Sequence, residues 1–600
     1  MKRIFLTLAL AFVASCATPG QDGGKTASQG WSDGDRGEFY TRDQGSRIMK
    51  TNWMKALKQP DGQPFLADKL DRYGYLPNDL APGALLPIGF TTNGSGANEA
   101  IGMTCSACHT REITIKGVRH RIDGGPAIVD FEALLVDLDI AVKSVLSQPA
   151  VFEVFARDVL GTGATTQATA ALKQEVVTWD KRFGQLVKSS ILDPRAKTGQ
   201  PVWGPGRLDA VSMIFNRLTG LDIAPDGRDG MIPENIYPAH APVRYPFLWG
   251  SAKQDLTQWP GFAPNGDRIL GLVRNVGEVY GVFADFHPTP KATATMKVDY
   301  ASINSVNIPG LRALERQIEA LQQPAYPWPI NADLANQGKD LFGTGPGEKK
   351  GLCWDCHGER QGKRRLGNLD TWETPLRDVG TDNLQYSVLM RTVKSGTMNG
   401  SGLFPLLPAI KPVDDAANVL KTAVVGGILQ KLIPFTAGPR IAGAEPSGDP
   451  LDGMRIQAPS DRSTREHILA NSKLAQELTR IDPPQADTDD GPFKYESRVL
   501  RGIWAAAPYL HNGSVPTLAD LLEPASNRPE SFKVGPEYDP VKVGLAADQT
   551  KFSTVTRTTT CEGRKPNAMW DSGNGRCGHE YTNSLTAQQK RALLEYLKTL

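Results

Sequence analysis

The chain has 600 residues, a formal net charge of +2, 60 glycines and 44 prolines. This length allows about two to four domains and a large buried core. Acidic and basic residues are nearly balanced and form no long run of one sign, which argues against nucleic acid as a partner. The many glycines and prolines favour a fold with long irregular loops over a helical bundle.

The first residues resemble an export signal. A short basic start precedes an apolar run, 4–13, that is too short to span a membrane in a mature protein. The sequence Val-Ala-Ser-Cys16 resembles a bacterial lipobox, in which the cysteine is acylated and becomes the mature N-terminus. We therefore expect a lipoprotein signal peptide at 1–16. An ordinary secretory signal cut nearby is the alternative.

The residue after Cys16 is Ala17 rather than aspartate, a pattern that resembles sorting to the outer membrane. The expected location is the outer membrane, facing the periplasm or the cell surface, with the lipid anchor as the only membrane contact. A Gly/Ser/Thr/Gln-rich stretch at 17–30 is predicted to be a flexible tether.

Two copies of the motif C-x-x-C-H follow in the chain. Two thiols three positions apart can each add to one vinyl group of a haem, and the adjacent histidine can bind the iron as proximal ligand. The motif therefore predicts two covalently bound haem c groups, whereas two unrelated thiol pairs are the alternative. The predicted residues are Cys105, Cys108 and His109 in the first copy, and Cys353, Cys356 and His357 in the second.

Apolar residues recur at helical spacing in four segments between the motifs: 131–146, 166–192, 268–286 and 308–321. The segment 201–264 is rich in proline, glycine and tryptophan, as expected for a wall of a ligand cavity or for a packed layer of loops. The segment 120–126, after the first motif, is predicted to be a turn.

A Pro-rich linker, 324–329, is the predicted boundary between two units. We expect an N-terminal haem domain at 31–323 and a C-terminal cytochrome c-like haem domain at 324–600 with a large insertion. Asn331 is a candidate N-cap of a helix that contains Gly338, and Thr586 begins a capping box before the last helix. The predicted fold is mainly α with long irregular loops, as two cytochrome c-like haem domains packed together.

Cys561 and Cys577 lie in a polar stretch near the end of the chain. Because loop cysteines of an exported protein commonly pair, a disulfide between them is predicted, with two free surface thiols as the alternative.

The segment 501–518, which contains Leu-His511-Asn-Gly-Ser, is similar to a loop of bacterial diheme cytochrome c peroxidases. Together with 541–544, 578–581, 86–90 and 121–126, it more closely resembles the extracellular rubber oxygenases, which are related to those peroxidases. This resemblance implies two haems, of which the first, on His109, is open and reactive and the second is bis-ligated. A calcium ion between the two domains is a further expected cofactor.

The chain departs from the peroxidases in the ligand of the second haem. They use a methionine after the His-x-Gly-Ser loop, but the only methionine after His511 is Met569, inside the predicted disulfide loop. By elimination, and because the family has a Gly-His-Glu-Tyr segment at this place, His579 is the predicted distal ligand opposite His357. His511 is expected to make hydrogen bonds near the haem and is the rival ligand.

Two residues are candidates for catalysis. Trp259, or else Trp249, could relay electrons between the haems, although core packing is the default role of a tryptophan. Glu278 could act as the acid/base group of a peroxidase, although a carboxylate on the surface of a helix is its expected state.

Three functions fit these features. The first is a diheme oxidoreductase that activates dioxygen to oxidise a small-molecule or polymeric apolar substrate. The second is a peroxidase that takes electrons from a small redox protein. The third is an electron-transfer protein without a substrate.

Overall fold

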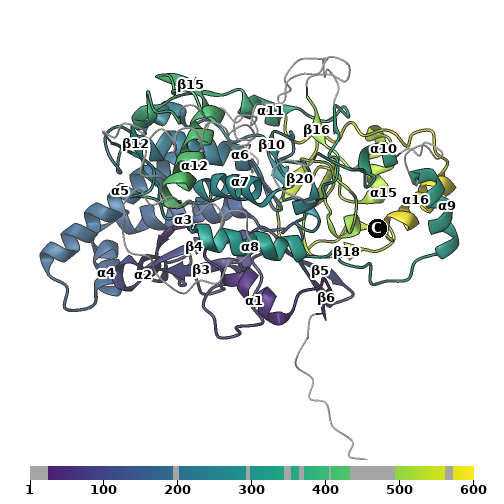
Figure 1. The fold of residues 1–600 in the computed structure, drawn as a ribbon. Coiled ribbons are helices and arrows are strands. Elements are labelled where there is room, and N and C mark those ends of the chain that lie inside the picture. Colours follow the sequence, from purple (N-terminus) through teal and green to yellow (C-terminus); the bar gives the residue numbers. More distant parts are fainter. Residues whose placement is uncertain are drawn as a thin grey trace, which may run out of the picture.

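The computed structural model describes residues 25–192, 202–291, 297–343, 353–363, 370–403, 407–432, 493–560 and 572–600. Its helices run in the order shown in Figure 1. They are α1 (Asp33–Thr41), α2 (Thr51–Ala56), α3 (Phe131–Ser147), α4 (Pro149–Leu160), α5 (Thr166–Ser190), α6 (Ala210–Phe215), α7 (Arg268–Gly281), α8 (Ile308–Ala320), α9 (Ala332–Phe342), α10 (Trp354–His357), α11 (Leu384–Leu389), α12 (Ala416–Leu432), α15 (Leu518–Leu521) and α16 (Ala587–Leu597).

The strands form small sheets. Two sheets have three strands: β1 (Lys25–Thr26), β6 (Val118–Asp123) and β5 (Thr110–Ile115), and then β2 (Met49–Lys50), β4 (Ala100–Met103) and β3 (Phe90–Asn93). The paired strands are β7 (Arg207–Leu208) with β8 (Val243–Arg244), β9 (Leu256–Thr257) with β10 (Ala263–Pro264), β11 (Thr289–Pro290) with β12 (Val298–Asp299), β13 (Leu376–Arg377) with β16 (Tyr495–Glu496), β14 (Thr392–Lys394) with β15 (Val413–Asp415), β17 (Ser531–Lys533) with β20 (Val555–Arg557), and β18 (Tyr538–Asp539) with β19 (Gly544–Leu545).

The predicted fold class is wrong. The chain is 39% helical and 15% strand, with many small sheets, and it does not show two cytochrome c-like haem domains. One reason is that a single hydrophobic core holds residues from both halves of the chain, among them Phe247, Phe342 and Leu593. Another is the hairpin of β5 and β6, where Ile113 pairs with His120. The predicted turn at 120–126 therefore begins inside a strand.

Four predicted helices are confirmed as α3, α5, α7 and α8. Helix α7 ends earlier than expected, at Gly281. Phe283, two residues later, has a φ of +72°, which is incompatible with a continuing right-handed helix. Apolar spacing beyond this point reflects burial of the loop, since Phe283 and Phe286 are both buried.

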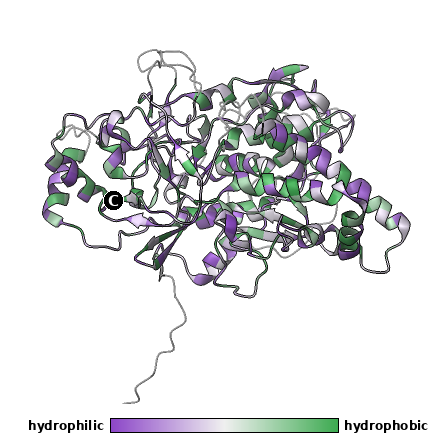
Figure 2. Ribbon diagram, turned by 180° about the vertical axis from the view of Figure 1, so that it is seen from behind, coloured by the Kyte–Doolittle hydropathy of each residue, from purple (hydrophilic) through white to green (hydrophobic). Residues whose placement is uncertain are grey.

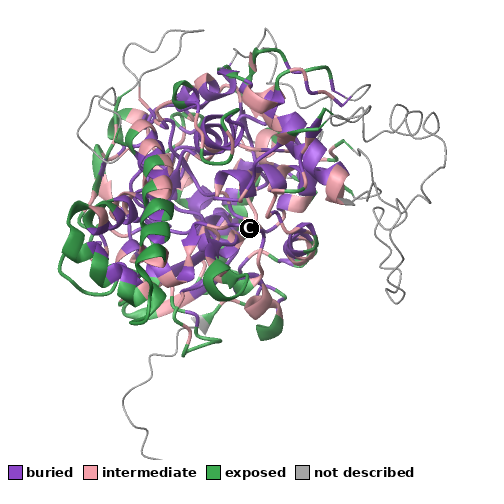
Figure 3. Ribbon diagram, turned by 90° about the vertical axis from the view of Figure 1, so that its left-hand side faces the viewer, coloured by how far each residue is buried: buried purple, intermediate pink, exposed green. Residues whose placement is uncertain are grey.

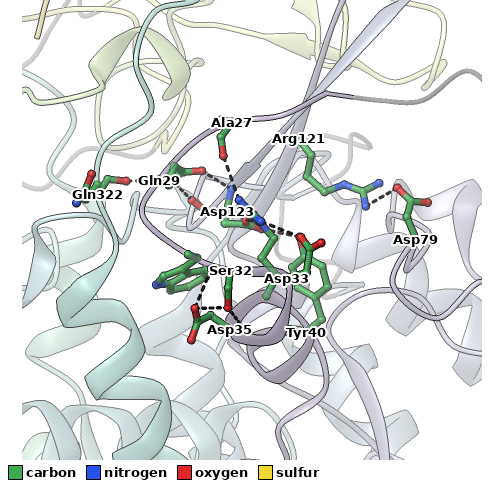
Figure 4. Close-up of polar contacts among 12 residues, drawn as sticks. Ala27, Gln29, Ser32, Asp33, Asp35, Tyr40, Asp79, Arg121, Asp123 and Gln322 are labelled. Carbon is green, nitrogen blue, oxygen red and sulfur yellow. Dashed lines mark hydrogen bonds and ion pairs between the residues drawn. The ribbon is translucent and has the colours of Figure 1, made fainter.

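Asp123, at the end of β6, anchors the N-terminal segment (Figure 4). The side chain of Gln29 donates to the Asp123 carbonyl at 2.8 Å and accepts from the Asp123 amide at 2.9 Å. The buried Asp123 carboxylate accepts from the Tyr40 hydroxyl at 2.6 Å and from Arg36 Nε at 3.0 Å. Strand β1 runs parallel to β6. The described part of the expected tether is thus attached to β6, the second strand after the first C-x-x-C-H motif.

Helices α9 and α16 pack against each other at one end of the molecule (Figure 1). Asn331 accepts a hydrogen bond from the Leu334 amide, and Thr586 and Gln589 form a capping box, so both predicted helix starts are confirmed. A Cβ at Gly338 would collide with the carbonyl of Ala592. Gly338 therefore offsets its cost to helix stability by allowing the two backbones to approach closely.

The interior holds three large hydrophobic clusters, one over α2 to α5, one around α6, α7 and α12, and one shared by the chain's two halves. Green hydrophobic stretches alternate with hydrophilic ones along the helices (Figure 2). Buried residues gather inside, and exposed residues lie on the outer helix faces (Figure 3). Among the described helices, none has the length and apolar character that crossing a membrane requires.

Candidate haem sites

The first C-x-x-C-H motif lies between β4 and β5, in a 3-10 turn at Cys105–Ala107. Gly89 has a φ of +84°, and a Cβ there would collide with the backbone of Ala107. Only glycine permits this close approach, so the backbone at Gly89 can pack directly against the turn that carries the motif. His109 follows, and its Nδ1 lies 2.9 Å from the carbonyl oxygen of Pro246.

The surroundings of the first motif keep its side chains uncharged. Burial raises the pKa of the Cys105 and Cys108 thiols to about 12. A hydrogen bond from Tyr245 acts in the opposite direction on Cys108. Burial lowers the pKa of His109 to about 4, against the opposing effect of its bond to Pro246. The site thus presents thiols and a neutral imidazole, the state in which a histidine can bind a metal.

The second motif begins at Cys353 and continues as the short helix α10. The Cys353 amide donates to the Phe342 carbonyl at 3.3 Å, which joins the motif to the end of α9. His357 Nδ1 lies 2.7 Å from the carbonyl oxygen of Arg498. Burial lowers the pKa of His357.

His579, the predicted distal ligand, lies beside His357, and its role as a ligand stays a prediction. The two ring centroids are 6.0 Å apart, with 48° between the ring planes. The His579 amide donates to the Val379 carbonyl at 2.7 Å, and Arg528 donates to the Gly578 carbonyl at 2.8 Å. Burial, followed by electrostatic repulsion of a second proton by His357 and Arg528, lowers the pKa of His579 to about 3. The loop therefore holds a neutral imidazole against the second motif.

Both motif histidines have the tautomer that metal binding requires. A carbonyl oxygen can only accept, so Nδ1 of His109 and of His357 must carry the proton. Each Nε2 is then free to bind iron. With metal–nitrogen bonds of about 2 Å, two imidazoles on opposite sides of one metal have centroids about 6 Å apart. The separation of His357 and His579 fits this arrangement.

A cavity of about 180 Å³ surrounds the second motif. Its walls include Leu593 and Leu597 of α16, and the cation Arg244. Burial lowers the pKa of Arg244 to about 9, and its guanidinium donates to the carbonyls of Leu510 and Ala506. Apolar walls and a buried cation bonded to uncharged carbonyls fit an apolar macrocycle that carries anionic propionates.

His511 lines the same cavity but has other partners. Its ring stacks on Tyr495 with centroids 3.9 Å apart, and its Nε2 lies 3.4 Å from the Asp382 carboxylate. Asp382 also accepts from Asn512. His511 therefore lies against Tyr495 and Asp382, and its role near the haem stays a prediction.

Trp259 and Trp249 are both buried. Trp259 lines the cavity of the second motif, lies under Arg244 at 4.9 Å and has its ring 6.5 Å from that of His511. Trp249 stacks on Phe247 and donates to the Arg501 carbonyl at 2.7 Å. The segment 201–264 therefore contributes to cavity walls, as one of its two predicted roles requires.

The expectation that Glu278 is a surface carboxylate is wrong. Glu278 is half-buried and lines a second cavity, of about 80 Å³, whose other walls are mostly apolar. Gln258 Nε2 donates to Glu278 at 2.6 Å. Burial raises the pKa of Glu278, although Gln258 and Arg274 act against it. After burial, the charge of Glu278 contributes to the raised pKa of both Cys105 and Cys108.

The other predicted site residues lie partly outside the described chain. Cys577 is disulfide-bonded, whereas Cys561 and Cys16 belong to segments that the structure does not describe. The described residues contain no group of three or more His, Cys, Asp or Glu side chains that could hold a metal ion. The calcium ion stays a prediction.

Sequence reasoning missed the residues that surround the motifs. Tyr245, Gln258, Arg274 and Arg498 lie far from both motifs in the chain, and no local pattern marks them. A weak signal existed for Arg498, which directly precedes the segment 501–518 used for the resemblance.

Residues 494–533 match the protein-family model "RoxA-like, cytochrome c-like". The chain is similar to the uncharacterized protein y4iJ of Sinorhizobium fredii, with 30% identity over 630 residues that cover 95% of this chain and 92% of that protein. It is also similar to the uncharacterized protein y4iM of the same organism, with 39% identity over 371 residues, 59% of this chain and 63% of that protein.

The family model supports a RoxA-like haem family for this chain. The predicted relation to the diheme cytochrome c peroxidases stays a prediction. The chain therefore belongs to the same family as y4iJ, and its RoxA-like, cytochrome c-like segment identifies it as a protein of c-type haem.

Proposed function

We propose that the chain is a diheme oxidoreductase in which the haem of the first motif reacts with an oxygen species and the haem of the second motif relays electrons. The difference between the two pockets supports this division most directly. His357 faces a second imidazole, that of His579, at 6.0 Å. The separate cavity lined by Glu278, which we assign to the first haem, instead offers apolar walls and a carboxyl group.

In this proposal His357 and His579 would both hold the second haem iron. A haem with both axial positions filled transfers electrons and does not bind oxygen. Arg528 supports this role, because it holds the carbonyls of Arg576 and Gly578 at 2.6 and 2.8 Å and so fixes the loop that presents His579.

At the first motif, His109 would hold the haem iron. A haem bound there would supply the binding and activation of dioxygen or peroxide. The cavity lined by Glu278 would hold an apolar substrate beside it and exclude water. We propose dioxygen as the oxidant and a small-molecule or polymeric apolar compound as the substrate. The apolar lining residues that support this are Val211, Ile214, Phe215, Phe262, Leu270 and Val273.

A second candidate function is the reduction of hydrogen peroxide, and Glu278 favours it. Burial raises the pKa of Glu278, and a carboxyl group whose pKa is raised in this way can donate a proton as a general acid. Gln258 holds this group in place by its hydrogen bond at 2.6 Å. The electrons would then come from a small redox protein.

Two further roles complete the proposal. Trp259 relays electrons, since it lines the cavity of the second motif, lies against Arg244 and has its ring 6.5 Å from that of His511. The protein is exported and anchored in the outer membrane through Cys16, because c-type haem is attached outside the bacterial cytoplasm and the lipobox-like sequence precedes that cysteine.

Turnover assays on the air-purified protein test the proposal. Oxygen uptake that depends on an unsaturated apolar substrate supports the oxygenase. Peroxide consumption with a reduced cytochrome or cupredoxin as donor, without such oxygen uptake, supports the peroxidase. Activity in neither assay contradicts both and leaves electron transfer alone.

A further inference from the structure

Arg498 is bonded to the surroundings of both motif histidines. Its carbonyl oxygen accepts from His357 Nδ1 at 2.7 Å. Its guanidinium Nη1 donates to the Phe247 carbonyl at 3.0 Å. The preceding carbonyl, that of Pro246, accepts from His109 Nδ1 at 2.9 Å. These three hydrogen bonds connect the imidazole of His357 to that of His109, through Arg498 and the dipeptide 246–247.

The Arg498 side chain is fixed from several directions. Its Nε donates to Gln254 Oε1 at 2.9 Å and lies 3.2 Å from the Glu496 carboxylate. Its guanidinium carbon lies 4.7 Å above the Phe247 ring. Arg498, Gln254 and Glu496 are all buried, with relative exposures of 6%, 4% and 8%. A buried guanidinium held by this many partners has one geometry.

We infer that Arg498 is a positioning residue for both haems, because its main-chain carbonyl is the partner of His357 and its side chain holds the Phe247 carbonyl, one residue after the carbonyl partner of His109. The inference rests on the proposed function, which places a haem at each motif. The hydrogen bond from Nδ1 of a metal-bound histidine sets the ring orientation and raises the basicity of the ligand. Displacing Arg498 therefore alters the bond to iron at both sites together.

The substitution Arg498→Lys tests this coupling. Lysine keeps the positive charge and the main-chain carbonyl, but its single ammonium cannot reproduce the planar fork that holds Phe247 and Gln254. The expected result is a positive shift of both midpoint potentials, because a weaker Nδ1–H bond makes each imidazole a poorer donor to ferric iron. Electron paramagnetic resonance should still report the wild-type axial ligands.

Arg391→Lys is the matched control. Arg391 is likewise buried and donates to a main-chain carbonyl, that of Pro238, at 3.0 Å. Its guanidinium lies 5.1 Å over the ring of Tyr237. Among the described residues, it makes no hydrogen bond to His109, to His357 or to the carbonyl partner of either histidine. Both potentials should stay at their wild-type values in this variant.

A second variant keeps the test decisive if Arg498→Lys does not fold. Gln254→Leu leaves Arg498 in place but removes its acceptor, so both potentials should shift in the same direction by a smaller amount. Potentials that match those of Arg391→Lys, or a shift confined to one haem, overturn the inference.

A haem count on the same wild-type sample distinguishes failure of the proposed function from failure of the inference about Arg498. Fewer than two haems contradicts the proposed function, whereas two haems with unmoved potentials contradicts the role of Arg498 alone.

Discussion

The ring centroids of His357 and His579 lie 6.0 Å apart, although His357 follows a C-x-x-C pair and His579 lies just before the last helix. The loop of His579 is fixed from two sides. Gly578 has a φ of +76° and packs so closely on Gly380 that a Cβ would collide, and Arg528 bonds to the carbonyls on either side of Cys577. A preformed position for the second imidazole lowers the entropy lost when both rings bind one metal.

We predict that His579→Ala removes one axial ligand of the second haem. Electron paramagnetic resonance of the ferric protein should then show one low-spin bis-histidine signal replaced by a high-spin signal, with the first haem unchanged. His511→Ala is the matched control, because His511 lines the same cavity but bonds to Asp382. Loss of the low-spin signal in His511→Ala, with His579→Ala unaffected, would make His511 the ligand.

We predict that Glu278→Gln lowers peroxide turnover by about 10²- to 10⁴-fold, the usual contribution of a positioned acid/base group. Glutamine keeps the size and hydrogen-bonding capacity of the side chain but cannot exchange a proton. Glu234→Gln is the control, since Glu234 is an exposed glutamate paired with Lys394 at 2.9 Å. Equal loss in both variants, or none in Glu278→Gln, contradicts a catalytic role.

The pH profile gives a second test of Glu278. Burial raises its pKa above the ordinary value of 4.5, so its protonated form persists to higher pH than that of an exposed glutamate. If the protonated form donates in the limiting step, activity is full below the raised pKa and falls as the pH rises through it. Glu278→Gln should lack this limb. A limb that survives in the variant belongs to another group.

We predict that Gly338→Val destabilises the fold, because a side chain there meets the Ala592 carbonyl and Tyr596. Overpacking of this kind costs about 1–3 kcal/mol, which should lower the midpoint of thermal unfolding. Gly83→Val is the control, since a Cβ at Gly83 has no atom within 4 Å. An unchanged midpoint in Gly338→Val would show that α9 and α16 separate without cost.

Local chemistry made part of this molecule predictable. The cysteines and the histidine of each C-x-x-C-H motif are neighbours in the sequence, so both motifs could be identified without knowing the fold. The helices α3, α5, α8, α9 and α16 could also be predicted, since their apolar spacing and their caps at Asn331 and Thr586 are local signals.

The rest depends on contacts between distant segments. Glu278 has the sequence of an amphipathic helix surface, and only the packing of α7 beside Gln258 turns it toward a cavity. Arg498 could not be identified because its partners, His357 and Phe247, are brought to it by the fold. The fold class failed for a related reason. The strands are short, and their pairing joins segments such as β13 and β16 that lie far apart in the sequence.

The central claim is that each C-x-x-C-H motif carries one covalent haem, and a pyridine haemochrome assay measures this directly. The account predicts two haems per chain in the wild-type protein. It also predicts one haem per chain in Cys105→Ala and one in Cys353→Ala, with the remaining haem in each variant keeping its own spectrum. A single haem per wild-type chain, or a cysteine variant that retains two, would contradict the account.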